Sequence, residues 1–146
     1  MIKSESSVEI TKPVSQVFAF VEDHSKAPEW LESCVELRQT SSGPKQAGAA
    51  MHYVYREGSG KKEMDGTVTA YFKDRQLTMK FADSKFGVQI EFLVVLAPHG
   101  TLVTHSIEIE VKGFFGKLMS GMIEAGNKKQ VTNNLSRMKL LLEKSV

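Results

Sequence analysis

The sequence contains one cysteine, Cys34, so the 146-residue chain cannot form an internal disulfide framework. No apolar run approaches the roughly 20 residues that a membrane-spanning helix needs. Residues 1–10 lack the apolar segment of a signal peptide. These absences predict a cytoplasmic protein. The formal net charge is only +2, which gives no indication of nucleic acid as a partner.

Motifs for several common enzyme chemistries are also missing. There is no G-x-S-x-G motif, phosphate-binding loop or dinucleotide-binding fingerprint. The four histidines, His24, His52, His99 and His105, show no ligand-like spacing with one another or with Cys34. We therefore predict neither a metal site nor a cofactor.

The composition is that of a folded protein. Hydrophobic residues make up 41% of the chain and charged residues 25%, which is typical of a globular domain rather than a disordered segment. The length is sufficient for one hydrophobic core, and no linker, internal repeat or low-complexity tract divides the chain. We predict a single domain over residues 1–146.

The first 31 residues predict one strand and two short helices. Residues 2–10 alternate weakly between polar and apolar, as in a strand. Apolar residues at helical spacing then predict a helix over about residues 13–21, with Thr11 as its cap and Pro13 in its first turn. A second short helix is expected to carry Trp30.

From Cys34 to Val111 the apolar residues alternate with polar ones, which is typical of strands with one buried face. Turn residues divide this stretch into six strands, which predicts an antiparallel meander. Within residues 62–72 the predicted apolar face holds Met64, Gly66, Val68, Ala70 and Phe72, and Gly66 is a candidate β-bulge.

Residues 113–146 contain no proline and predict one long helix. Its first half is broadly apolar, whereas its second half keeps a regular spacing that predicts core packing through Val131, Leu135, Met138 and Leu142. A sheet with one apolar face must cover that face, and this helix is the long element available. The predicted fold is therefore α+β: about seven antiparallel strands curve around the C-terminal helix, and two short helices follow the first strand.

This order of elements resembles the START-like or helix-grip superfamily (SRPBCC), and in particular its polyketide cyclase/dehydrase-like branch. The resemblance covers essentially the whole chain. It is carried by Ile10, Pro13, Val17, Phe18, Val21, Asp23 and Pro28-x-Trp30, by Gly113-Phe114-Phe115-Gly116, and by Leu135, Met138, Leu141 and Leu142. The resemblance implies a ligand-binding fold with a cavity between sheet and helix, but it provides no catalytic motif.

The predicted lining of such a cavity is apolar, aromatic and rich in methionine, which adapts to irregular shapes. It comprises Met51, Tyr53, Tyr55, Met64, Met79, Phe81, Ile90, Phe92, Ile107, Phe115, Met119 and Met122. A flat or flexible hydrophobic ligand would fit this lining. The alternative is that these side chains pack against one another as an ordinary core.

Polar side chains on the apolar faces are the candidate chemical groups. His105, Tyr53 and Tyr55 could orient a ligand or act as catalytic acid and base, because a buried imidazole or phenol needs a hydrogen-bond partner. The alternative for His105 is a core histidine whose hydrogen bonds are satisfied within the protein. Trp30 is a candidate for closing the cavity mouth; the alternative is a tryptophan packed between the short helices and the sheet.

Three functional hypotheses follow. The first is the binding of a hydrophobic small molecule, such as a lipid, a polyketide or an isoprenoid-like metabolite. The second is an enzyme of the cyclase, aromatase or dehydratase type acting on a polyketide-like substrate. The third is a protein-interaction module that uses a sheet edge or the basic side of the last helix, which could also contact a membrane surface. We expect a monomer or a weak homodimer.

Overall fold

Seven antiparallel strands form one curved sheet in the order β1-β7-β6-β5-β4-β3-β2, which confirms the predicted fold class. The computed structural model describes residues 1–113 and 120–144. The elements are β1 (Ile2–Ile10), α1 (Val14–Glu22), the 3-10 turn η1 (His24–Lys26), α2 (Ala27–Trp30), β2 (Cys34–Gln39), β3 (Ala50–Glu57), β4 (Gly60–Phe72), β5 (Gln76–Ala82), β6 (Phe86–Ala97), β7 (Gly100–Val111) and α4 (Ser120–Lys144).

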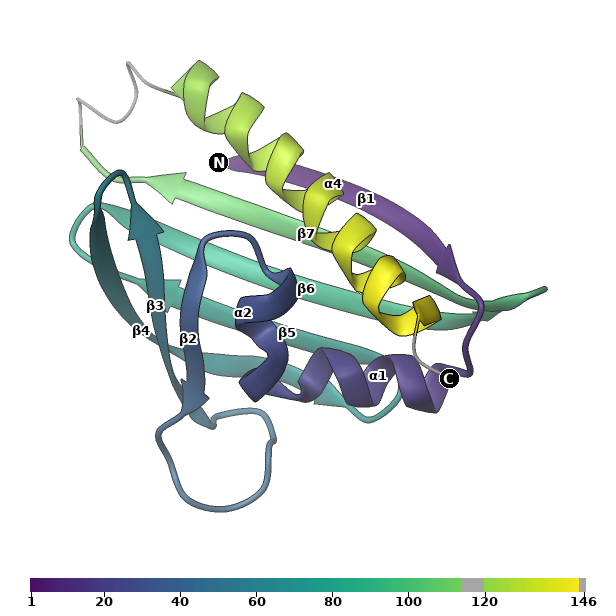
Figure 1. Ribbon diagram of the computed structural model, residues 1–146. Helices are drawn as coiled ribbons and strands as arrows, with labels where there is room; N and C mark the ends of the chain where they lie inside the picture. Colours follow the sequence, from purple (N-terminus) through teal and green to yellow (C-terminus); the bar gives the residue numbers. More distant parts are fainter. Residues whose placement is uncertain (114–119, 145–146) are drawn as a thin grey trace.

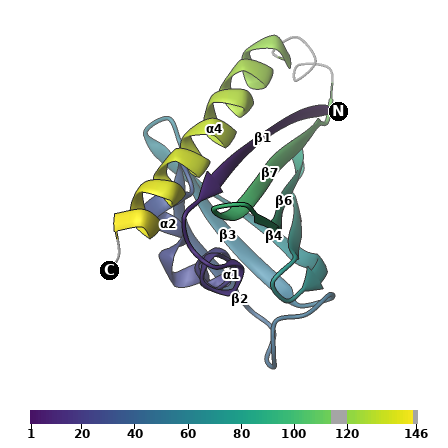
Figure 2. The same ribbon diagram turned by 90° about the vertical axis from the view of Figure 1, so that its right-hand side faces the viewer.

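Helix α4 crosses the concave face of the sheet, with β1 and β7 beneath it (Figure 1). In the view turned by 90°, the sheet curls toward the helix, and α1 and α2 lie against the same face (Figure 2). β1 turns Ser4 and Ser6, which are small and half-buried, toward the inner face. Small side chains at these positions let the helix backbone approach the strand closely. None of the described helices is long and apolar enough to span a membrane.

The two halves of α4 differ in their packing. Val131, Leu135, Met138 and Leu142 in the second half are all at most 4% exposed, which confirms their predicted place in the core. In the first half, the inward-facing positions are Ile123, Asn127 and Gln130, while Met122 is 72% exposed. The second half therefore provides most of the apolar contact between α4 and the sheet.

Two helix boundaries differ from the prediction. Helix α1 begins at Val14, and its N-cap position is Pro13, so Thr11 does not cap it. Thr11 instead donates its backbone N–H and its hydroxyl to Glu143 Oε2 on α4, at 3.0 and 3.1 Å. Gly113 has φ +88°, outside the helical range, and so it does not begin the last helix.

The predicted bulge at Gly66 is wrong, and the position of the actual bulge explains a second error. Gly66 stays in regular register with Met51 and Phe81, and the register shifts between Val68 and Ala70. The extra residue reverses the alternation, so the predicted inner positions of Ala70 and Phe72 are also wrong. Phe72 is 57% exposed, and Tyr71 instead packs against Phe18 on the inner side.

Candidate functional site

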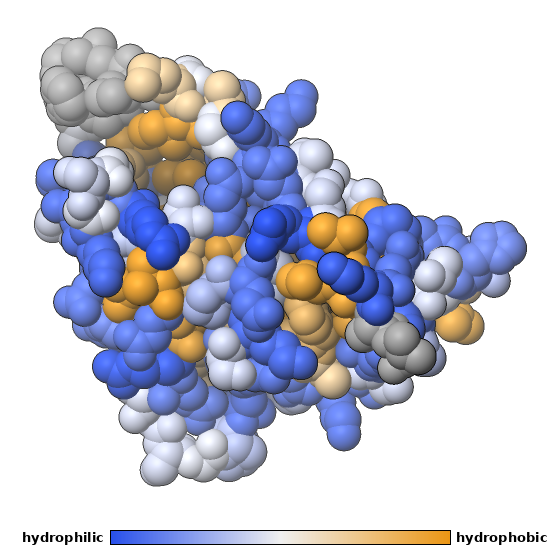
Figure 3. Space-filling view, in the orientation of Figure 1, coloured by the Kyte–Doolittle hydropathy of each residue, from blue (hydrophilic) through white to orange (hydrophobic). Residues whose placement is uncertain are grey.

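A cavity of about 260 Å³ lies between the sheet and the first half of α4; we call it the sheet–helix cavity. Figure 3 shows apolar side chains gathered in a hollow beside the start of this helix. The lining consists of Ser33, Tyr53, Tyr55, Arg56, Glu57, Met64, Phe86, Val88, Ile90, Ile107, Ile109, Ile123 and Gln130.

The apolar wall of this cavity follows from strand pairing. Val88 pairs with Ile109 and Ile90 pairs with Ile107 across β6 and β7, so four branched side chains lie side by side on the inner face. Tyr53 pairs with Met64 across β3 and β4, and this pair continues the wall on the other side. The sequence alternation thus gives a continuous apolar surface with only a few polar groups at its margin.

Tyr53 and Tyr55 are the polar groups of the inner wall, and their rings stack with centroids 5.4 Å apart. Burial raises the pKa of both phenols, and the neighbouring Asp83 and Glu57 raise that of Tyr55 further. Both side chains therefore stay protonated at neutral pH. They can donate a hydrogen bond to a ligand oxygen, but the raised pKa makes them weak proton donors and leaves no phenolate to act as a base.

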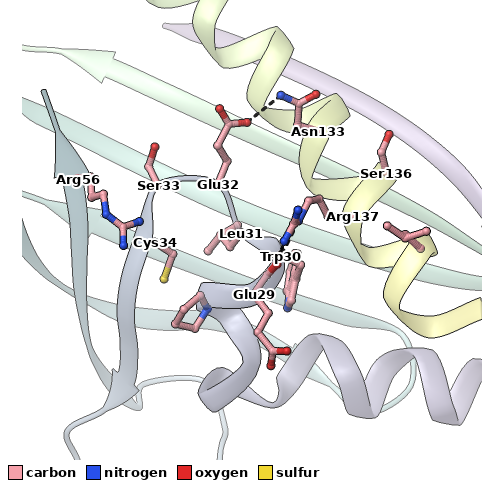
Figure 4. A pocket seen from close by; sticks show the side chains of 12 residues that line it. Glu29, Trp30, Leu31, Glu32, Ser33, Cys34, Arg56, Asn133, Ser136 and Arg137 are labelled. Carbon is pink, nitrogen blue, oxygen red and sulfur yellow. Dashed lines mark hydrogen bonds between the residues drawn. The ribbon is translucent and has the colours of Figure 1, made fainter. Parts of the chain in front are cut away.

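A second hollow, of about 490 Å³, lies between the α2–β2 segment and the second half of α4; we call it the outer pocket (Figure 4). It is lined by Pro28, Glu29, Trp30, Leu31, Glu32, Ser33, Cys34, Arg56, Asn133, Ser136, Arg137 and Leu140. Burial raises the pKa of the Cys34 thiol to about 12, so this side chain is not a nucleophile at neutral pH.

The structure brings some of the predicted site residues together and separates others. Tyr53, Tyr55, Met64, Ile90 and Ile107 all border the sheet–helix cavity. The other predicted residues of the sheet are fully buried in the core and do not border the cavity: Met51, Met79, Phe81, Phe92 and His105. Met122 is on the surface, and Phe115 and Met119 lie outside the described residues.

Trp30 borders the outer pocket and not the sheet–helix cavity. Its ring is 3% exposed, meets Phe92 edge-on at 5.3 Å and lies 5.9 Å from Phe20. The tryptophan is thus packed between the short helices and the sheet. Its buried indole N–H has no hydrogen-bond partner among residues 1–113 and 120–144.

His105 belongs to a hydrogen-bond network inside the core. Asn134 Oδ1 accepts the backbone N–H of Glu32 at 2.7 Å, so Asn134 Nδ2 must be the group that faces His105 Nε2 at 3.0 Å. Since Nδ2 can only donate, Nε2 carries no proton, and Nδ1–H donates to the carbonyl of Glu91 at 3.0 Å. The ring stacks on Phe92 with a centroid separation of 4.2 Å. Both nitrogens of His105 are therefore satisfied within the protein.

This environment makes stability depend on pH. Burial lowers the pKa of His105 to about 4, from an ordinary value of 6.5, and the carbonyl of Glu91 offsets this only partly. Between these pH values the unfolded chain binds more protons. His105 should therefore contribute a fall of about 3 kcal/mol in the free energy of unfolding as the pH drops from 6.5 toward 4, in addition to the fall from His24, whose pKa burial also lowers to about 4. Urea unfolding at a series of pH values should show a flatter dependence for His105→Gln. If the stability of both proteins fell equally with pH, His105 would not be a source of the pH dependence.

Sequence reasoning missed several cavity residues. Phe86, Val88 and Ile109 lie on the predicted apolar faces, near the strand ends, and Ile123 and Gln130 lie on the inner side of α4. Ser33, Arg56 and Glu57 border the cavity from the β2 and β3 termini. The alternation indicated the correct face for the first three, but no sequence signal indicated which end of the sheet is hollow. Among the described residues, no group of His, Cys, Asp and Glu side chains is arranged to hold a metal ion.

The comparisons with known proteins agree with this arrangement. The family model described as "Polyketide cyclase / dehydrase and lipid transport" matches residues 1–143. The chain belongs to this family. A comparison with curated protein sequences gives no match.

Several solved structures share the fold of this family member, although their sequences are only distantly similar to it. TTHA0849 from Thermus thermophilus has a TM-score of 0.79 and 14% identity, covering 98% of this chain and 99% of that one. The Polyketide_cyc-like protein Cgl2372 from Corynebacterium glutamicum has a TM-score of 0.63 and 21% identity, covering 96% and 91%. DynU16, a putative protein in the dynemicin biosynthetic locus, has a TM-score of 0.66 and 18% identity, covering 99% of this chain but 48% of its own.

Proposed function

We propose that the protein binds a hydrophobic small molecule, such as a lipid, a polyketide or an isoprenoid-like compound, in the sheet–helix cavity. The observation that carries this proposal is the continuous apolar wall formed by Val88, Ile90, Ile107 and Ile109 beneath the first half of α4. Burying apolar ligand surface against such a wall contributes roughly 25 cal/mol per Å². The family description, which names lipid transport beside cyclase and dehydrase activity, supports the same class of ligand.

The tyrosines would orient the ligand within this apolar site. A pocket that is mostly apolar gains specificity from a few placed polar groups. Tyr53 is 6% exposed and Tyr55 is half-buried, so their hydroxyl groups act in a largely desolvated environment. Because both phenols remain protonated, a ligand carbonyl or hydroxyl oxygen is the matching acceptor.

Filling the cavity tests the proposal directly. Val88→Trp should weaken the binding of a neutral fluorescent probe, N-phenyl-1-naphthylamine, by at least about tenfold. The reason is that the indole would occupy much of the 260 Å³ cavity. Val95→Trp is the matched control, since Val95 is 55% exposed on the outer face of β6. Equal probe binding by both variants, or no binding by the unmodified protein, would refute the cavity as a binding site.

The alternative function is cyclisation or dehydration of a polyketide-like compound, assisted by hydrogen bonds from the phenols to a carbonyl oxygen. It is favoured by the convergence of the two protonated phenols, Tyr53 and Tyr55, on one cavity. His105 is 0% exposed and hydrogen-bonded to Glu91 and Asn134, so it is not the partner base in this arrangement. Chromatography of the released compound with mass detection separates the two functions, because a carrier releases its ligand unchanged, whereas cyclisation changes the retention time and dehydration also lowers the mass.

A further inference from the structure

The sheet–helix cavity and the outer pocket meet at Ser33 and Arg56, which line both. The backbone N–H of Arg56 donates to the carbonyl of Ser33 at 2.8 Å and ties the end of β3 to the segment before β2. Ser33 has φ +67°, a left-handed conformation that a non-glycine residue adopts only when its surroundings require it. This junction is therefore a defined boundary between the two hollows, of which the outer pocket has more charged side chains in its lining.

Arg56 brings an unpaired positive charge to this boundary. Its guanidinium extends from β3 toward Cys34 (Figure 4), and across the described ranges it has no hydrogen-bond or ion-pair partner. The other arginine of the outer pocket, Arg137, already donates to the carbonyl of Glu29, from Nε at 3.2 Å and from Nη2 at 2.9 Å. Of these two arginines, Arg56 thus has its full donor capacity available.

We propose that the ligand is a single-chain amphiphile with an anionic head: its apolar chain lies in the sheet–helix cavity and its carboxylate binds Arg56 at the boundary. This inference rests on the proposed function. The planar guanidinium matches a carboxylate in geometry. Arg56 is exposed, so it can hold a hydrated head group at the cavity mouth while the chain lies against the apolar wall. Tyr55, at the same margin, can donate a further hydrogen bond.

Four acidic side chains lie near this boundary: Glu29, Glu32, Glu57 and Asp83, of which Asp83 acts on Tyr55. Glu32 accepts a hydrogen bond from Asn133 at 3.0 Å and is thereby directed toward α4 (Figure 4). Glu29 borders the outer pocket but not the sheet–helix cavity, whereas Glu57 borders the cavity itself, next to Arg56. Glu57 repels an anionic head, so Glu57→Gln should strengthen its binding.

The cavity volume sets the length of a suitable probe. A volume of 260 Å³ corresponds to about nine water molecules at about 30 Å³ each. If each carbon of a saturated chain takes about the space of one water molecule, a chain of nine or ten carbons matches the cavity. Decanoate, decanol and decyltrimethylammonium have such a chain and differ mainly in head-group charge.

The test measures displacement of the neutral probe N-phenyl-1-naphthylamine by each of the three compounds. The unmodified protein should bind decanoate about three- to fivefold more tightly than decanol, because Arg56 is exposed, and decyltrimethylammonium most weakly. Arg56→Gln should remove the preference for decanoate while decanol binding stays within about twofold. Arg38→Gln is the matched control, because Arg38 is exposed on β2 and paired with Glu36 at 3.0 Å; it should keep the preference.

The outcomes distinguish this inference from the proposed function. If the probe does not bind, or binds Val88→Trp as well as Val95→Trp, hydrophobic binding in the cavity is itself refuted. If the probe binds in the cavity but none of the three compounds displaces it, the single-chain amphiphile is refuted while cavity binding stands. If decanoate and decanol bind the unmodified protein equally, the anionic head is refuted while cavity binding stands. The preference of the unmodified protein should also shrink in high salt, which tests the charge without any variant. A preference that survives both Arg56→Gln and high salt would overturn the role of Arg56.

Discussion

Replacing Asn134 by leucine is expected to lower the free energy of unfolding by about 4 kcal/mol, although leucine has the same branching and number of side-chain heavy atoms and suits a helix. Asn134 is 0% exposed and bridges two groups that are otherwise unpaired, the backbone N–H of Glu32 and Nε2 of His105. Each such group costs about 1–3 kcal/mol when it is buried without a partner. Urea unfolding at pH 7 measures the effect.

The neighbouring residue provides the control. Asn133 also contacts Glu32, through a hydrogen bond from Nδ2 to Oε2 at 3.0 Å, but this bond is exposed to solvent. Asn133→Leu should therefore cost less than about 1 kcal/mol. If both variants lost the same free energy of unfolding, the hydrogen bonds of Asn134 to Glu32 and His105 would not have the stabilising effect described.

Replacing Gly66 by alanine should destabilise the protein by at least about 3 kcal/mol, or about 10 °C in Tm. A Cβ atom at this position would lie 2.1 Å from the carbonyl oxygen of Lys80 and 2.6 Å from Phe81 Cδ1. The oxygen belongs to the β5 backbone and cannot rotate away, so the pairing of β4 with β5 would have to shift. Thermal unfolding followed by circular dichroism measures the loss.

Gly87→Ala is the matched control for Gly66→Ala. Gly87 also lies inside the sheet, in β6, but its added Cβ would meet Glu110 at an ordinary contact distance of 3.5 Å. This variant should change the free energy of unfolding by less than about 1 kcal/mol. A similar loss at both positions would indicate a general intolerance of side chains in the sheet rather than the contact with β5.

The fold was predictable from sequence because its main signals are local. Alternation identified the strands, turn residues separated them, and the spacing of Val131, Leu135, Met138 and Leu142 identified the packed half of α4. The error in β4 has a physical reason. One bulge between Val68 and Ala70 exchanges the faces of all later residues in the strand, and Gly66, the candidate for that bulge, is required instead for close strand contact.

The candidate site was predictable only in part. Periodicity shows which face of a strand points inward, but not whether the space above a given residue is filled. Phe92 and His105 are covered by Trp30 and Asn134, whereas Val88 and Ile109, on the same face of the same strands, border the cavity. The difference depends on where α2 and α4 cross the sheet. The sequence did not indicate Arg56 as a site residue, because its proposed role depends on its position between two hollows that form only on folding.

The unequal packing of α4 separates the residues that maintain the fold from those that shape the binding site. Asn134, Leu135 and Met138 hold the helix in place, while the inward-facing positions that border the cavity are Ile123 and Gln130. Substitutions at these two positions can alter the size and polarity of the hollow without removing a core contact of the second half. The cost of changing Gln130 is limited to its exposed hydrogen bond to the carbonyl of Glu32, so the shape of the hollow can change at little cost in stability.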